Sequence, residues 1–143
     1  ALMQKIHDAK ATHATKITAW GTGTPRREFL HVDDCADALI FLMKFYSGDG
    51  PINIGCGLDI SITELTQLIM NCVGFEGMIE FDKSKPDGTP KKLLSLRWLQ
   101  SMGWAPKISL AEGLQLTYTW FLNNVGGSFG PRDLPGTQTL LIN

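Results

Sequence analysis

The sequence lacks a strong charge of either sign, because its 13 lysine and arginine residues nearly balance its 14 aspartate and glutamate residues. Proteins that bind nucleic acid through their overall electrostatic field carry a clear positive excess, so we expect no nucleic-acid partner. The sequence also lacks any run close to the roughly 20 apolar residues that cross a membrane. Residues 1–15 alternate apolar with charged side chains, unlike a signal peptide. We therefore expect no membrane association.

Cysteine is scarce. Cys35, Cys56 and Cys72 are an odd number, and their spacings match neither a zinc site nor a disulfide framework. Reduced thiols in a cytoplasmic protein are the simplest interpretation, and no metal site is predicted. The 143 residues are enough for one domain with a substantial core.

Residue patterns for oxidoreductase chemistry are also missing from the chain. In a Tyr-x-x-x-Lys pair the lysine lowers the pKa of the phenol for proton transfer, but neither Tyr46 nor Tyr118 is followed by lysine at the fourth position. The segment 55–57 begins like a dinucleotide-binding loop, yet Ile60 stands where its third glycine belongs. We predict no catalytic and no cofactor-binding residue in this chain.

The most distinctive stretch that is present runs from Trp20 to Asp34 and reads WGTGTPRREFLHVDD. Its two arginines present rigid forks of donors that match phosphate oxygens, and its glycines allow backbone N–H groups to approach an anion closely. The ring of Trp20 could stack on a base or a sugar. Together these features indicate a grip for a nucleoside diphosphate. The structural alternative is a hairpin of residues 17–20 against 28–32 with solvated arginines, which composition alone slightly favours.

Hydrophobic periodicity and turn residues predict an α/β fold. Helices are expected at 1–12, 34–46, 62–73, 96–102 and 110–123. Strands are expected at 16–20, 28–32, 51–55 and 78–81. Helix 62–73 has a capping box of Ser61 with Glu64 and ends at Gly74, and Asp33 is the expected N-cap of helix 34–46. Helix 34–46 is apolar around most of its circumference, so we expect neighbours on more than one side.

The last part of the sequence combines a helix with an irregular tail. A second capping box, Ser109 with Glu112, begins the helix. Its predicted buried face comprises Leu110, Leu114, Thr117 and Phe121. Glycine and proline then dominate residues 125–143, which predicts a tail without regular structure. We expect its apolar end to pack on another surface, such as a neighbouring chain.

The segment 82–92 is a polar loop in which Asp87 and Gly88 supply a carboxylate on a turn. Four lysines surround this carboxylate: Lys83, Lys85, Lys91 and Lys92. The default interpretation of such a charged run is a solvated loop. The functional interpretation is that Asp87 accepts hydrogen bonds from sugar hydroxyls while the lysines add a positive field toward phosphate.

Three segments, taken together, form a pattern known from one family. They are WGTGTPRREFLHVDD from Trp20, INIGCG from Ile52 and SKPDGTPKKLL from Ser84. These segments resemble the GDP-L-fucose synthase family of extended short-chain dehydrogenases/reductases, and the likeness runs in order from residue 1 to about residue 124. The resemblance implies an enzyme that converts GDP-4-keto-6-deoxy-D-mannose to GDP-L-fucose by epimerising C3 and C5 and reducing C4 with NADPH.

The resemblance also implies roles for individual residues. Trp20, Arg27 and Asp87 match positions that bind the GDP-sugar substrate in the family. Lys5 falls where the family usually has an arginine, so a bidentate fork becomes a point charge. Ser95 replaces a customary aspartate.

In the family, the NADP-binding loop and the proton-transfer residues precede the part that is matched here. We therefore expect residues 1–124 to form the C-terminal, substrate-binding lobe with fragments of the Rossmann domain, and 125–143 to be a tail without a family counterpart. The chain alone should be inactive and should self-associate through exposed apolar faces, as a homo-oligomer or an exchanged dimer. The alternatives are a fragment of an enzyme acting on a UDP- or dTDP-sugar and a non-catalytic nucleotide-binding module.

Overall fold

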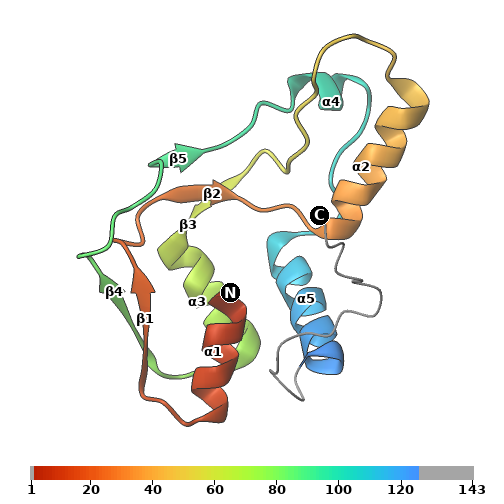
Figure 1. The fold of residues 1–143 in the computed structure, drawn as a ribbon. Helices are drawn as coiled ribbons and strands as arrows, with labels where there is room; N and C mark the ends of the chain where they lie inside the picture. The colour runs from red at the N-terminus through yellow and green to blue at the C-terminus, as the bar shows by residue number, and fades with distance from the viewer. Residues whose placement is uncertain (1, 126–143) are drawn as a thin grey trace, which may run out of the picture.

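The computed structural model describes residues 2–125, which form an α/β arrangement as predicted (Figure 1). The helices in this part are α1 (Leu2–Ala11), α2 (Val32–Phe45), α3 (Ile62–Val73), α4 (Arg97–Ser101) and α5 (Leu110–Asn124). The strands are β1 (Lys16–Trp20), β2 (Arg26–Glu28), β3 (Asp59–Ser61), β4 (Met78–Asp82) and β5 (Lys91–Lys92). None of the described helices has the length and apolar character that a membrane crossing requires. Apart from Val125, the predicted tail lies outside the described residues.

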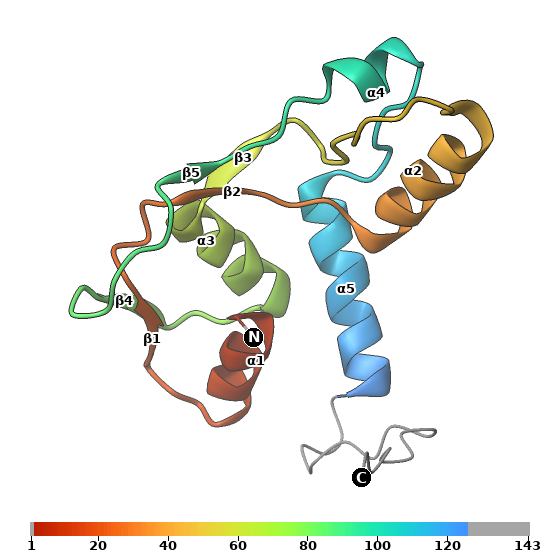
Figure 2. The same cartoon turned by 45° about the horizontal axis from the view of Figure 1, so that its top comes forward.

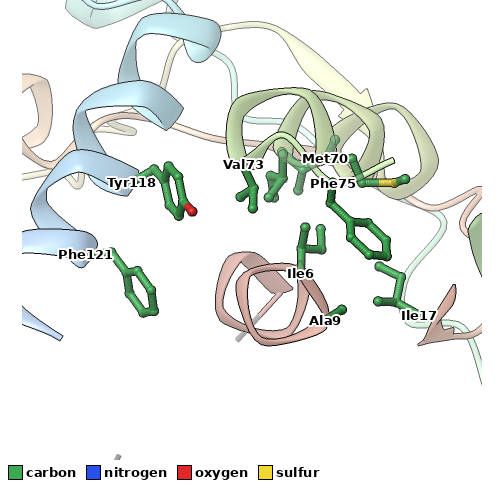
Figure 3. Packing of buried hydrophobic residues seen from close by; sticks show 10 residues of the cluster. Ile6, Ala9, Ile17, Met70, Val73, Phe75, Tyr118 and Phe121 are labelled. Atoms are coloured by element: carbon green, nitrogen blue, oxygen red, sulfur yellow. The ribbon is translucent and has the colours of Figure 1, made fainter. Parts of the chain in front are cut away.

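The main core lies where α1, α3 and α5 meet the two-stranded sheet of β1 and β4 (Figure 3). Strand β1 alternates exposed and buried positions, so Ile17 points inward. Ile6 is fully buried on α1 and packs in the same cluster as Ile69 of α3. The predicted strands 16–20 and 78–81 are confirmed, and they pair in parallel with Ile17 opposite Ile79.

Helix α3 follows its sequence signals closely. Ser61 is the N-cap, and its hydroxyl accepts the N–H of Glu64 while the Glu64 carboxylate accepts the N–H of Ser61, as a capping box requires. Gly74 ends the helix in the left-handed conformation with φ 72°. Its apolar spacing predicts Leu65, Leu68, Ile69 and Cys72 on the buried face; Leu65 and Ile69 are buried, whereas Leu68 and Cys72 are only half-buried.

The predicted strand 28–32 is wrong in its position, and the hairpin with residues 17–20 does not form. The strand is Arg26–Glu28 instead, and it lies in the centre of a second sheet, antiparallel to β3 and parallel to β5. The chain turns away from β1 at Gly21 and Gly23, whose φ values are 82° and 76°. After Glu28 the chain leaves the sheet, because Phe29 packs against the main core and the next residue packs against a second cluster.

Helices α2 and α4 lie at one end of the described part, and strands β1 and β4 lie at the other (Figure 2). The three-stranded sheet lies between these two ends. Helices α2 and α4 share a small second core centred on Ala38, Leu99 and Trp104. Helix α2 begins two residues earlier than expected, because His31 rather than Asp33 is the N-cap. The helix remains exposed over part of its apolar surface, so the expected covering on more than one side is absent from the described part of the chain.

The predicted strand 51–55 does not form. Ile52 and Ile54 pack against the second core, which preserves the alternation that suggested a strand. A strand also requires a partner for its backbone hydrogen bonds, and no described segment pairs with these residues.

A buried carboxylate fixes the start of α5 against α2. Asp34 is 3% exposed and accepts the backbone N–H groups of Lys107 and Ile108 at 2.9–3.1 Å. Ser109 then caps α5. The second bond of a capping box, from the Ser109 N–H to the Glu112 carboxylate, is absent among the described residues, so the predicted capping box is only half formed. The predicted buried face is wrong at Thr117, which is exposed.

Tyr118, rather than Thr117, is buried on the inner face of α5. Tyr118 lies beside His7 of α1, whose Nδ1 is 3.0 Å from the phenol oxygen. The helix is therefore rotated slightly from the expected orientation, because the aromatic ring packs between α5 and α1 (Figure 3).

Candidate functional site

A pocket of about 120 Å³ lies between the loop that follows β1 and the loop that follows β4. It is lined by Trp20, Gly23, Pro25, Arg27, Ile62, Pro86, Asp87 and Gly88. Strands β1 and β4 are parallel neighbours with Trp20 opposite Asp82, so both loops leave the same edge of the sheet. Three of the four candidate residues, Trp20, Arg27 and Asp87, therefore surround one pocket.

The fourth candidate, Lys5, is not among the lining residues. Its ammonium group on α1 donates a hydrogen bond to the backbone carbonyl of Thr18 in β1. This contact holds the side chain beside the strand that leads to Trp20, without placing it at the pocket.

Larger hollows occur elsewhere, but their chemistry differs. One of about 310 Å³ lies between α1, α3 and α5, and another of about 390 Å³ lies between the start of α2 and α5. Both are lined mainly by apolar side chains and contain neither arginine nor lysine. A third hollow, of about 400 Å³, contains Lys10, but its ammonium group donates to the carbonyl of Val73 and the acidic Glu76 lies in the same lining. The pocket of about 120 Å³ is thus the better match to an anionic ligand.

Asp87 is held in place by Thr22. The backbone N–H of Thr22 donates to one carboxylate oxygen of Asp87 at 2.8 Å, and the Thr22 hydroxyl donates to the other at 2.6 Å. These bonds, the hydroxyl's first, lower the pKa of the Asp87 carboxyl below its ordinary value. A Cβ at Gly21 would lie 2.2 Å from the carboxylate, so the close approach of Asp87 requires glycine there.

Arg27 supplies positive charge that no acid neutralises among the described residues. Among the described residues, its side chain donates only to the backbone carbonyl of Arg26, at 2.7 Å. The guanidinium group also lies against the loop that follows β4, since a Cβ built on Gly88 would be 3.0 Å from one of its nitrogens. The parallel pairing of β2 and β5 places Arg27 opposite Lys92. Like charges at paired positions are unfavourable, so an anion bound beside them would be stabilising.

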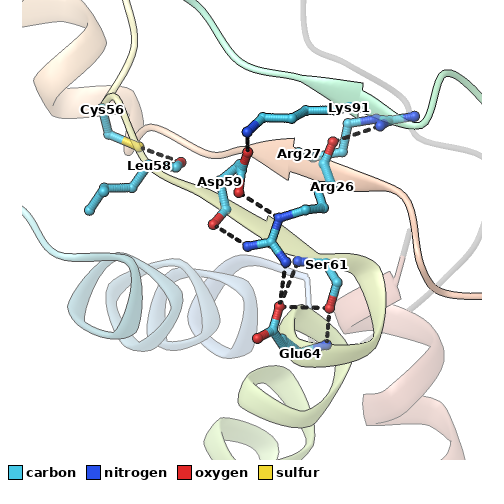
Figure 4. Close-up of polar contacts among 8 residues, drawn as sticks. All are labelled: Arg26, Arg27, Cys56, Leu58, Asp59, Ser61, Glu64 and Lys91. Carbon is cyan, nitrogen blue, oxygen red and sulfur yellow. Dashed lines mark hydrogen bonds and ion pairs between the residues drawn. The ribbon is translucent and has the colours of Figure 1, made fainter.

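The neighbouring cations, Arg26 and Lys91, form ion pairs with acidic residues of the protein. Asp59 accepts from Arg26 Nε at 2.6 Å and from Lys91 Nζ at 2.9 Å, and Glu64 is 3.4 Å from Arg26 (Figure 4). The hydrogen bonds from Lys91 and then Arg26 lower the pKa of the Asp59 carboxyl. Alternate residues of a strand face opposite sides, so Arg26 is paired within the protein while Arg27 stays available. The residue pattern by itself did not distinguish the two arginines, whereas the family resemblance named Arg27 alone.

Trp20 presents a large apolar surface at the pocket. Its side chain is 73% exposed, and Lys85 Nζ lies 5.8 Å from the ring centroid in a cation–π arrangement. An exposed indole of this kind can stack on a planar or sugar ring.

The glycine pair at 55–57 does not fit the phosphates of a dinucleotide. The N–H of Gly57 donates to the carboxylate of Glu28, and a Cβ at Gly55 would lie 2.4 Å from the same carboxylate. An acidic side chain of the protein occupies the place that an anionic ligand would need. We therefore assign no NADP contact to this loop.

The sequence gives no sign of two residues that hold charged side chains in place: Thr22, which binds Asp87, and Asp59, which binds Arg26 and Lys91. Thr22 stands between two glycines, and Asp59 follows an apolar residue just before a capping box. Neither setting signals a role, because the partners of both residues lie in a segment more than 30 positions away.

Comparison with known proteins adds independent evidence. The NAD dependent epimerase/dehydratase family matches residues 1–55. GDP-L-fucose synthase 1 of Arabidopsis thaliana is 53% identical over 125 residues, which make up 87% of this chain and 39% of that protein. The GDP-L-fucose synthase of Sinorhizobium fredii is 54% identical over 125 residues, 87% of this chain and 40% of that protein. The chain is homologous to the GDP-L-fucose synthases.

The fold supports the same relationship. The crystal structure of a GDP-L-fucose synthetase from Naegleria fowleri bound to NADP superimposes with a TM-score of 0.81 at 30% identity, covering 89% of this chain and 40% of that one. The resemblance to GDP-L-fucose synthases is thereby confirmed, as is the α/β fold of the extended short-chain dehydrogenases/reductases. The chain spans about two fifths of the length of these relatives.

Proposed function

We propose that this chain is the GDP-sugar-binding part of an enzyme that converts GDP-4-keto-6-deoxy-D-mannose to GDP-L-fucose by 3,5-epimerisation and NADPH-dependent 4-reduction. The observation that carries this proposal is the pocket shared by Trp20, Arg27 and Asp87, in which Arg27 has no acidic partner among the described residues. The relatives named GDP-L-fucose synthase support the choice of substrate.

Each pocket residue has a distinct part in this proposal. Arg27 holds the diphosphate through its guanidinium fork, assisted by Lys92 on the adjacent strand. Trp20 stacks on a ring of the nucleotide, and Asp87 accepts hydrogen bonds from sugar hydroxyls. Lys5 contributes a positive field from α1. Together these contacts position the sugar for chemistry carried out by residues elsewhere in the parent enzyme.

The cofactor in this proposal is NADP, bound by a part of the parent that precedes this C-terminal portion. The Naegleria fowleri relative is described as bound to NADP, whereas the 55–57 loop of this chain holds a carboxylate instead. NADPH supplies the hydride for C4 reduction when it is bound. Because this chain has no Tyr-x-x-x-Lys pair, the chain alone should not oxidise NADPH in the presence of the keto sugar.

Titration calorimetry with GDP tests the proposed site. Replacing Arg27 with alanine removes the charge-assisted contacts to phosphate and should raise the Kd for GDP roughly 10- to 100-fold. Arg97→Ala is the matched control, because it removes the same charge from an exposed position on α4 and should leave Kd unchanged. Equal affinities of Arg27→Ala and the unsubstituted chain would contradict the proposal.

The same titration with UDP and dTDP separates the alternatives. Preference for GDP supports the assignment drawn from the 84–94 segment, and equal or tighter binding of UDP would favour an enzyme acting on another nucleotide sugar. A non-catalytic nucleotide-binding module would bind GDP but would remain inactive even within its full-length parent.

We also propose a cytoplasmic location and self-association. All three cysteines are free, which accords with a reducing compartment. The apolar surface of α2 includes Ile40, Met43 and Phe45, each more than half exposed, and such a surface favours association with a second copy, including an exchanged dimer.

A further inference from the structure

Thr22 is not one of the candidate ligand-binding residues, yet both carboxylate oxygens of Asp87 bind to it. Its N–H reaches one oxygen at 2.8 Å and its hydroxyl reaches the other at 2.6 Å. Thr22 itself is not among the residues that line the pocket. It therefore contacts the carboxylate from outside the pocket, while Asp87 forms part of the wall.

The surrounding backbone is built for this contact. Gly21 donates its N–H to the carbonyl of Asp82 at 3.0 Å, which extends the pairing of β1 with β4 by one bond. A second glycine follows at 23, and Thr24 Oγ1 lies 2.7 Å from Thr22 Oγ1. Any side chain at Gly21 would collide with Asp87. The turn thus brings the two loops together at one point.

A carboxylate has about four positions at which it can accept hydrogen bonds. Thr22 uses one on each oxygen, and no other described residue donates to this carboxylate, so the remaining positions can accept from ligand hydroxyls. Because the two bonds hold both oxygens, they fix the plane of the carboxylate in the wall of the pocket. Preorganised acceptors lose less entropy when a ligand binds.

We propose that Thr22 is a positioning residue that orients Asp87 toward the sugar hydroxyls of a bound GDP-sugar. This inference rests on the proposed function and adds to it a residue that acts through Asp87 rather than on the ligand. Specificity for a hydroxyl-rich ligand then depends on a pair of residues from two loops. Arg27 and Trp20 act independently of that pair.

Calorimetry with GDP-L-fucose on four forms of the chain tests the inference: unsubstituted, Thr22→Val, Asp87→Ala and the double variant. Valine has the shape of threonine but lacks the hydroxyl, so Thr22→Val should raise the Kd about fivefold. The same substitution should have no further effect once Asp87 is alanine, because Thr22 acts through that carboxylate. Thr22→Ser keeps the hydroxyl and should restore binding to within about twofold of the unsubstituted chain.

A second measurement is independent of ligand. An NMR titration of the Asp87 carboxyl should give a lowered pKa in the unsubstituted chain and a pKa nearer the ordinary value in Thr22→Val. An unchanged Asp87 pKa, an unchanged Kd, or an equal loss from Thr22→Val in the Asp87→Ala background would each overturn the inference. Absence of GDP-L-fucose and GDP binding by the unsubstituted chain would instead refute the proposed function, and the inference with it.

Discussion

At the scale of single residues, the site depends on which neighbour each charge finds. Arg26 and Arg27 are adjacent in sequence, but Arg26 is paired with Asp59 and Arg27 is not. Asp59 also pairs with Lys91, and its side chain is only 9% exposed. One carboxylate therefore neutralises two cations on one side of the sheet, and the cations of Arg27 and Lys92 remain available for a ligand.

The Asp59 carboxyl makes stability depend on pH. Its pKa in the folded state lies below its ordinary value of 3.8 because of the hydrogen bonds from Lys91 and Arg26. The stabilisation is therefore fully present above about pH 4 and is lost as the pH falls through the lower folded pKa. Asp59→Asn should lower the urea midpoint at neutral pH, and the difference from the unsubstituted chain should shrink in acid.

The same substitution at Asp49 is the control for that experiment. Asp49 is exposed in the turn after α2 and forms no ion pair among the described residues. Asp49→Asn should leave the midpoint unchanged at both pH values. A loss of stability in Asp59→Asn that persists undiminished in acid would show that the charge of Asp59 is not its source.

At the scale of elements, helix α3 shows how much can be settled locally. Its start at Ser61, its reciprocal bond with Glu64 and its end at Gly74 all involve residues within a few positions of one another. Strand β2 is the opposite case. Its three residues owe their extended pairing to β3 and β5, and the N–H of Arg26 donates to the carbonyl of Pro90 at 2.8 Å.

Removing the N-cap of α3 should be measurable as a loss of stability. Ser61→Ala eliminates the hydroxyl that accepts the Glu64 N–H and should lower the free energy of unfolding by about 1 kcal/mol. Urea denaturation followed by circular dichroism measures this change. Ser95→Ala, at an exposed position outside any described helix or strand, should have an effect within about 0.5 kcal/mol. Equal effects of the two substitutions would argue against the cap.

At the scale of the whole molecule, two cores of unequal size are joined by the central strands. The larger core is enclosed by α1, α3, α5 and the β1–β4 pair, whereas the smaller core is formed by α2, α4 and the irregular segments that contain Ile52, Ile54 and Trp104. Met43 on α2 is 85% exposed. An exposed apolar helix face of this kind is stabilised when another surface covers it.

Light scattering coupled to size exclusion tests the proposed self-association. The chain should elute with a molar mass that is a multiple of one copy, and Met43→Glu should shift the distribution toward the monomer because it places a charge in the apolar face. Leu58→Glu changes an exposed apolar residue outside α2 and serves as the control. A single monomeric species of the unsubstituted chain would contradict self-association.

Features that depend on residues close together in the chain could be predicted before the fold was known. The α/β class, the strands 16–20 and 78–81 and the helix 62–73 with its caps all follow from periodicity and local hydrogen bonding. The motif around Arg27 and the segment around Asp87 were also sufficient to indicate the family to which the chain is related.

The contacts between distant segments became known from the folded chain. Folding placed β2 at Arg26–Glu28, left residues 51–55 without a pairing strand, and brought Asp87 onto Thr22 across 65 positions of sequence. The same holds for Arg26, whose partner Asp59 lies 33 positions away. Strand pairing and ion pairing are long-range interactions whose energy depends on geometry that no local pattern specifies, and for that reason the orientation of the site emerged only from the folded chain.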